Sequence, residues 1–106
     1  MPTLCTKIKL RKGSADRVTQ WAAELNRRAE EVREVLRSEG VSLEAAFLDT
    51  QADGVYIVYV MHSHDFEKAK AVATQSVAAI DAFHQGFKRD CWENTCKLET
   101  LIDFAL

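Results

Sequence analysis

The sequence of 106 residues has few residues that interrupt regular structure and no long hydrophobic run. Its single proline is Pro2, so no interior helix or strand is broken by proline. No segment approaches the roughly 18 consecutive apolar residues of a membrane-spanning helix. Lysines interrupt the short apolar stretch at the N-terminus, which argues against a signal peptide. The sequence therefore predicts no membrane association.

An excess of charge of one sign is also absent. The formal net charge of -2 gives no general attraction to nucleic acid. The basic residues near the N-terminus have no interleaved aromatic residues, so we expect no nucleic-acid partner. The cysteines are odd in number, which argues against a disulfide framework and predicts a reducing compartment, the cytoplasm. They are Cys5, Cys91 and Cys96.

The residues that are present favour a single globular domain over residues 1–106, with 47% hydrophobic and 28% charged residues. Alternating apolar and polar residues, or short β-branched runs, predict strands over 3–10, 41–50, 55–61 and 96–104. An apolar stripe at steps of three and four residues predicts a helix over 15–38. A second helical region begins near Phe66, breaks near Ser76 and continues over 77–92.

The order β-α-β-β-α-β is typical of the ferredoxin-like α+β fold, a four-stranded antiparallel sheet with its helices on one face. Because the helices cover one face only, the other face stays open, and two such sheets can pack face to face. We therefore expect a homodimer through the open face; the alternative is a solvated face. The residues expected there include Cys5, Lys7, Lys9, Glu44, Leu48, Glu99 and Leu101.

Several short phrases, taken in their order and spacing, carry a resemblance to a known family. They are Lys7-Ile8-Lys9-Leu10 with Gly13-Ser14; Trp21-Ala22-Ala23-Glu24-Leu25 with Arg28; Leu36-Arg37-Ser38-Glu39-Gly40-Val41; Glu44 with Phe47-Leu48; Asp53-Gly54-Val55-Tyr56; Ser76 with Ile80-Asp81 and His84; and Leu98-Glu99. Together they resemble an uncharacterised bacterial family of about one hundred residues, of the dimeric α/β-barrel type. The resemblance implies a ferredoxin-like protomer and a sheet-to-sheet dimer, and it implies no reaction.

Three polar residues are candidates for catalysis. Asp81 and His84 lie three residues apart on a predicted helix and share a face, so the carboxylate could orient the imidazole as a general base. In the alternative, both residues brace the helix against the sheet. Glu44 lies within a predicted strand. It could act as an acid, a base or a hydrogen-bond acceptor, or it could pair with Lys7 or Lys9 across the sheet.

Other residues are candidates for binding a small molecule. Tyr56, Tyr59 and Trp92 could line an apolar pocket, although aromatic residues at such positions also form cores. His62 and His64 lie two residues apart at a strand end, and we include His62 among the ligand-binding candidates. No further cysteine or histidine spacing completes a zinc site, and there is no glycine-rich phosphate loop, so we predict neither metal nor cofactor.

Two classes of function remain open. The first is a small-molecule-binding protein, in the form of a cofactor-free monooxygenase-like or isomerase-like enzyme, with His84, Asp81, Glu44 and Tyr59 as its polar groups. The second is a non-catalytic homodimer whose open sheet face serves association only. The first class requires a cavity that contacts both His84 and Glu44.

Overall fold

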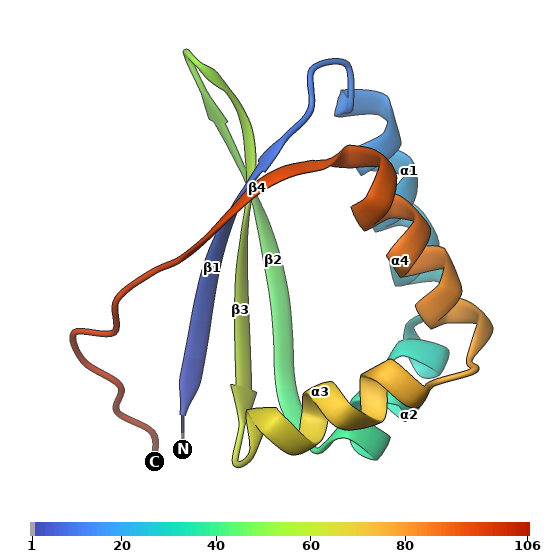
Figure 1. The fold of residues 1–106 in the computed structure, drawn as a ribbon, viewed down its shortest axis with the longest axis vertical. Coiled ribbons are helices and arrows are strands. Elements are labelled where there is room, and N and C mark those ends of the chain that lie inside the picture. Colours follow the sequence, from blue (N-terminus) through green and yellow to red (C-terminus); the bar gives the residue numbers. More distant parts are fainter. Residues whose placement is uncertain (1) are drawn as a thin grey trace.

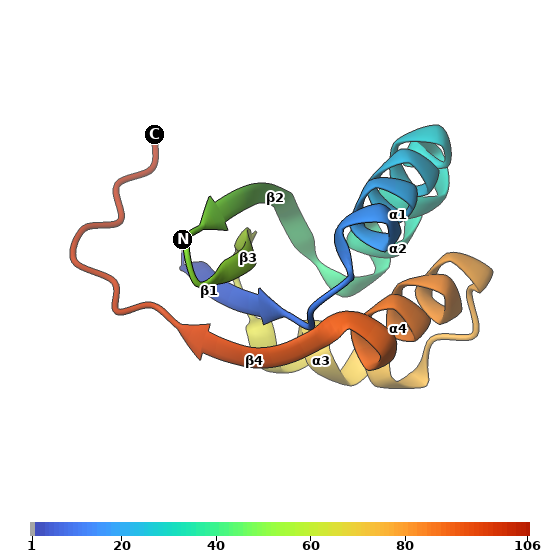
Figure 2. The same ribbon diagram turned by 90° about the horizontal axis from the view of Figure 1, so that it is seen from above.

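A computed structural model describes residues 2–106 and gives a four-stranded sheet with helices gathered on one side (Figures 1 and 2). The strands are all antiparallel to their neighbours and lie in the order β2-β3-β1-β4. In chain order the elements are β1 (Thr3–Leu10), α1 (Ala15–Arg27), α2 (Ala29–Glu39), β2 (Val41–Gln51), β3 (Gly54–Ser63), α3 (Phe66–Gln75), α4 (Ala79–Cys91) and β4 (Trp92–Lys97). The predicted ferredoxin-like α+β fold is confirmed.

Both predicted helical regions consist of two helices. The break near Ser76 is confirmed, since Ser76 has extended backbone between α3 and α4. The continuous helix expected over 15–38 is wrong in detail, because Arg28 leaves helical geometry between α1 and α2. Gly40 then ends α2 in the left-handed conformation, with φ of 73°, and the chain turns directly into β2. Asp65 caps α3 by accepting a hydrogen bond from the Lys68 amide at 3.0 Å.

The hydrophobic core lies between the sheet and helices α1 and α4. Trp21 of α1 stacks on Phe87 of α4, with ring centroids 4.6 Å apart. Ile8 and Ile57, from the two central strands, are opposite one another in the register and are almost fully buried. This core holds both helices against the sheet, and the candidate site lies beside it in the space between the two layers.

The last strand differs from the prediction of a strand over 96–104. It spans Trp92–Lys97 and pairs with β1, from Leu10 opposite Trp92 to Thr6 opposite Lys97. Helix α4 ends at Cys91, whose carbonyl accepts a hydrogen bond from the Arg11 amide at 2.8 Å, so the chain enters the sheet at once. Residues 98–106 form no helix or strand. Their alternating pattern is that of a strand, but the pairing with β1 ends at Lys97 opposite Thr6, and the chain leaves the sheet after the Leu98 amide donates to the Cys5 carbonyl at 2.9 Å.

The open face also differs from the prediction at the edge strand β2. The register places Glu44 opposite Met61 and Leu48 opposite Ile57, on the side of the helices. An irregularity between Val41 and Leu43 shifts the register. Glu44 and Leu48 are therefore wrong as members of the open face. Cys5, Lys7 and Lys9 do lie on that face, whereas Glu99 and Leu101 lie beyond the sheet.

Candidate functional site

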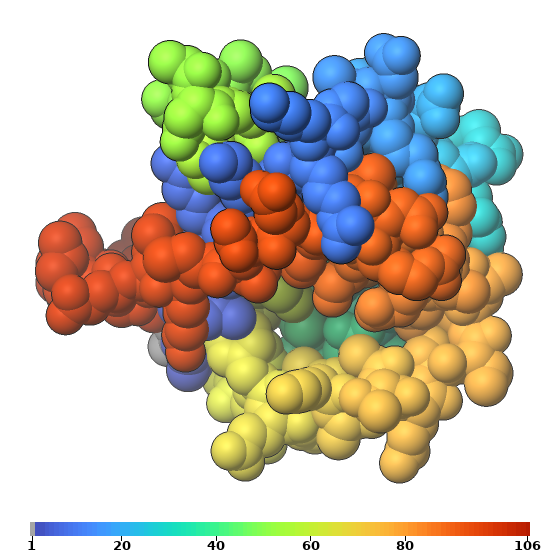
Figure 3. Space-filling model, turned by 45° about the horizontal axis from the view of Figure 1, so that its top comes forward, coloured from blue at the N-terminus to red at the C-terminus, as the bar shows by residue number. Residues whose placement is uncertain are grey.

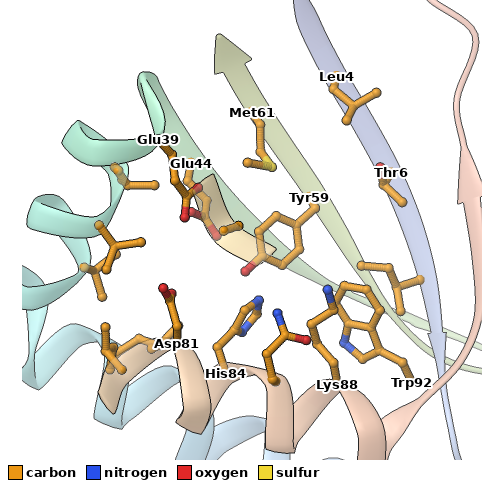
Figure 4. A pocket seen from close by; sticks show the side chains of 18 residues that line it. Leu4, Thr6, Glu39, Glu44, Tyr59, Met61, Asp81, His84, Lys88 and Trp92 are labelled. Atoms are coloured by element: carbon orange, nitrogen blue, oxygen red, sulfur yellow. The ribbon is translucent and has the colours of Figure 1, made fainter. Parts of the chain in front are cut away.

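A cavity of about 260 Å³ lies between the sheet and the helix layer. It is hollowed between α3 and α4, as Figure 3 shows from outside. Its wall is largely apolar, with a small group of charged and polar side chains (Figure 4). The polar members are Thr6, Glu39, Glu44, Tyr59, Asp81, His84, Gln85 and Lys88. Apolar walls with a few convergent polar groups are the usual composition of a small-molecule site.

Three carboxyl groups from three different elements enter this cavity. Glu39 ends α2, Glu44 lies on β2, and Asp81 lies in the first turn of α4. In Figure 4 the carboxyl of Asp81 points toward those of Glu39 and Glu44. Burial, with the charges of Asp81 and Glu44 adding to it, raises the pKa of Glu39 to about 7. This carboxyl can therefore hold or release a proton near neutral pH.

Glu44 lies at the centre of the polar group. Burial raises the pKa of Glu44, and the neighbouring charge of Asp81 raises it further. The hydrogen bond donated by the Tyr59 hydroxyl and the charge of Lys88 act in the opposite direction on that pKa. The same burial, together with the Glu44 charge, holds the pKa of Tyr59 well above its usual value, so the phenol keeps its proton.

His84 is surrounded by aromatic rings and has a defined hydrogen-bond partner. The indole nitrogen Nε1 of Trp21 donates to its Nδ1 at 3.1 Å. Burial and the charge of Lys88 lower the pKa of His84 to about 4, while Asp81 opposes this shift. His84 is therefore neutral at pH 7. Since indole N–H can only donate, Nδ1 is the acceptor and the ring proton lies on Nε2.

Two buried polar atoms of this site have no hydrogen-bond partner among the described residues. They are Oδ2 of Asp81, an acceptor when ionised, and Nε1 of Trp92, a donor. Buried polar atoms in folded proteins are nearly always paired, so at these two a water molecule or a ligand would supply the missing hydrogen bond. A ligand that satisfies both must offer a donor and an acceptor. Lys88 Nζ lies 4.6 Å from the centre of the Trp92 ring and adds a positive charge on this side.

The structure brings together most of the residues singled out in the sequence. Glu44, Tyr59, Asp81, His84 and Trp92 all line the cavity. Asp81 and His84 share a face of α4 as expected, but the hydrogen-bond partner of the histidine is an indole rather than this carboxylate.

Two predicted ligand-binding residues lie elsewhere. Tyr56 and His62 alternate with the cavity-facing residues of β3 and are on the open face of the sheet. The Tyr56 hydroxyl donates to Asp53 at 2.7 Å, and His62 Nδ1 is 3.3 Å from the hydroxyl of Thr3. They are not part of this cavity.

Sequence reasoning missed three members of the site. Trp21 belongs to the apolar stripe of α1, which is typical of a core residue. Glu39 lies in a charged stretch at a helix end, and Lys88 has the sequence context of an ordinary surface lysine. One signal was the position of Glu39 beside the helix-ending Gly40, directly before the entry to β2. Trp21 and Glu39 also lie within the phrases that carry the family resemblance, but those phrases assign no role to them, because the cavity is formed by tertiary packing.

No three histidine, cysteine, aspartate or glutamate side chains within residues 2–106 are placed to hold a metal ion. The same part of the chain contains no helix that is long and apolar enough to cross a membrane. All three cysteines are free thiols.

The fold and the cavity define a ferredoxin-like α+β domain with a carboxyl-lined site between its two layers. The chain belongs to a family of unknown function, DUF6176, whose model matches residues 1–105. The solved structures include the L-rhamnose mutarotase of Formosa agariphila, which is similar to this chain with a TM-score of 0.67 and 17% identity. That match covers 99% of this chain and 100% of the mutarotase chain. No curated protein sequence matches.

Proposed function

We propose that the protein binds a small uncharged molecule bearing several hydroxyl groups, such as a monosaccharide, and catalyses an isomerisation by proton transfer. One observation carries the proposal. The cavity combines a carboxyl group that titrates near neutral pH, Glu39, with an unpaired acceptor on Asp81 and an unpaired donor on Trp92. A hydroxyl group both donates and accepts, so a polyol satisfies both atoms.

Interconversion of sugar anomers is a reaction that such a site can perform. A base removes the proton from the anomeric hydroxyl while an acid protonates the ring oxygen. The bond between the anomeric carbon and the ring oxygen then breaks and leaves an open-chain carbonyl. Rotation and the reverse steps give the other anomer, and the protons return to the protein groups. The fold of the mutarotase noted above agrees with this reaction class.

The carboxyl groups are the best acid and base candidates in this scheme. Groups whose pKa lies near the working pH transfer protons most effectively. Glu39, with a pKa of about 7, meets this condition, and Glu44 has a raised pKa beside it. His84, whose pKa is about 4, is a weak base and serves instead as a hydrogen-bond donor through Nε2. Asp81 accepts a substrate hydroxyl, and the rings of Tyr59 and Trp92 form apolar walls.

We also propose that the protein is a cytoplasmic homodimer that associates through the open sheet face. Phe47 on that face is 59% exposed, and Val58 and Val60 beside it are only half-buried. Neighbouring exposed apolar residues on one surface are typical of a protein interface. The free thiols fit a reducing compartment.

The test uses a panel of neutral reducing sugars, starting with L-rhamnose. Binding is read as an increase in melting temperature. Catalysis is read as faster equilibration of freshly dissolved single anomers, followed by NMR. Glu39→Gln and Glu44→Gln should each slow the catalysed rate by about 100-fold or more. Glu30→Gln, on the exposed surface of α2, is the matched control and should leave the rate unchanged.

The outcomes separate the alternatives. Binding without faster equilibration would overturn the enzymatic part of the proposal and leave a sugar-binding protein. No binding of any neutral sugar, with binding of an anionic or aromatic compound instead, would overturn the ligand class.

A further inference from the structure

Residues 98–106, which we call the C-terminal arm, leave the sheet after β4 and extend away from the body of the molecule (Figures 1 and 3). Figure 2 shows the arm on the side of the sheet opposite to the helices. The arm therefore reaches past the open sheet face, the surface through which we propose dimerisation.

Polar bonds hold the arm in this position. The Leu98 amide donates to the carbonyl of Cys5 at 2.9 Å. Further along, the amide and hydroxyl of Thr3 both donate to the carboxylate of Asp103, at 2.8 and 2.7 Å. The arm is thus attached to β1 at two points, and its path is set by hydrogen bonds of its own chain.

The apolar side chains of the same arm point into solvent. Leu101 is 86% exposed, Ile102 76% and Phe104 90%, and Leu106 at the chain end is also fully exposed. Single exposed apolar residues are ordinary, but several of them together in one short segment mark an interaction surface. Here Asp103 is bonded to β1 within the chain, whereas the apolar side chains beside it are left uncovered.

Charge indicates what the arm contacts. The arm carries the carboxylate of Glu99 in addition to the bonded Asp103. On the open face, Lys9 has no carboxylate within 4 Å among residues 2–106, whereas Lys7 is paired with Asp49 at 3.2 Å. An acidic, apolar arm is complementary to a face that exposes Phe47 and carries Lys9. Both surfaces belong to this chain, so a second copy can satisfy both.

We propose that in the homodimer the C-terminal arm of each copy packs against the open sheet face of the other copy. Such an exchange is reciprocal, as a two-fold axis requires, because each copy gives one arm and receives one. Specific interfaces bury about 800 Å² or more per partner, so we expect the arm and the sheet face to belong to one continuous interface. The inference rests on the homodimer proposed above and is independent of the chemistry of the cavity.

The test compares dimer dissociation constants by sedimentation equilibrium. The double variants Leu101→Asp/Phe104→Asp and Leu101→Ala/Phe104→Ala remove the apolar contacts, the second without adding charge. Each should weaken the dimer by at least about 30-fold. Val77→Asp is the matched control, because Val77 is equally exposed but lies between α3 and α4, away from the arm. Its dissociation constant should equal that of the unmodified protein.

Unchanged circular dichroism confirms that the variants fold, as expected for residues that contact little in their own chain. A dimer whose dissociation constant is unaltered by either double variant would overturn the arm exchange and leave the sheet-face dimer standing. Equal weakening by Val77→Asp would also overturn it. A monomer at all concentrations of the unmodified protein would overturn the homodimer itself, and the exchange with it.

Discussion

The two faces of the sheet differ in the kind of side-chain group that has no partner or cover within the chain. On the helix side the unpaired groups are polar, namely Asp81 Oδ2 and Trp92 Nε1, both buried. On the open side Lys7 is paired with Asp49, and the side chain that stands without cover is apolar, Phe47. Unpaired buried polar atoms suit a small polar ligand, and uncovered apolar groups suit a protein surface. The same alternating strands therefore support two different kinds of binding.

The largest expected effect contrasts one phenylalanine from each face. Phe87→Ala should destabilise the protein by about 4 kcal/mol, because Phe87 is 1% exposed and stacks on Trp21. Phe47→Ala should cost less than about 1 kcal/mol in dilute protein, since its side chain is 59% exposed.

Urea unfolding at several protein concentrations measures both variants. If Phe47 contacts a second copy, the loss of unfolding free energy in Phe47→Ala grows with protein concentration, whereas the loss in Phe87→Ala does not. Equal deficits for the two variants in dilute protein would contradict the distinction between the faces.

The second prediction concerns pH and the helix side alone. The pKa of Glu39 is about 7 in the folded protein and near 4.5 when unfolded, so the folded state binds the proton more tightly. The stabilisation of the folded state by protonated Glu39 is fully present below pH 4.5 and is lost as the pH rises to 7. For His84 the folded pKa of about 4 lies below 6.5, so stability is lost as the pH falls from 6.5 to 4. The two slopes oppose one another between pH 4.5 and 6.5.

Single variants separate these slopes. In His84→Gln the free energy of unfolding should fall by about 2 kcal/mol or more between pH 4.5 and 7, because the opposing slope of His84 is gone and Glu39 and Glu44 both have raised pKa values in the folded protein. In Glu39→Gln it should rise over pH 4 to 6.5. Urea titrations at half-unit pH intervals give both curves. Parallel curves for the two variants would show that these groups do not titrate as described.

A smaller effect is expected for the Trp21→Phe variant. It keeps the stacking on Phe87 but removes the indole donor to His84 Nδ1, which should cost about 1 kcal/mol. The ring proton of His84 should then no longer be confined to Nε2. Nitrogen-15 NMR of the imidazole distinguishes the two tautomers. Leu25→Val, in the same helix stripe, is a control for packing and should leave the tautomer unchanged.

The sequence predicts much of this fold, because the periods of the apolar residues are local signals. Strands 41–50 and 55–61 lie within β2 and β3, and the break at Ser76 is in place. The last strand was misplaced because an alternating pattern does not show whether the residues pair with an adjacent strand. In Cys96–Phe104 that pattern continues past the end of pairing with β1, into the C-terminal arm.

The site was predicted in part for the same reason. Asp81 and His84 share a helix face by spacing alone, so their proximity is local information. The orientation of Glu44 depends on an irregularity near Val41, and a shift of one residue moves a side chain to the other face of a sheet. The pairing of Trp21 with His84 joins residues 63 apart in the sequence, which no local pattern encodes.

The smallest expected effect lies on the open face. Lys7 Nζ is 3.2 Å from Asp49 and 4.5 Å from the centre of the Tyr56 ring, in a partly exposed position. Asp49→Asn should cost less than about 0.5 kcal/mol, because water screens such pairs and the ring contact remains. The difference should vanish in 1 M salt. A cost above about 2 kcal/mol in dilute protein would mean that this pair is desolvated within one copy. The open face would then be a completed surface rather than one that awaits a partner, and the contrast with the helix side would fail.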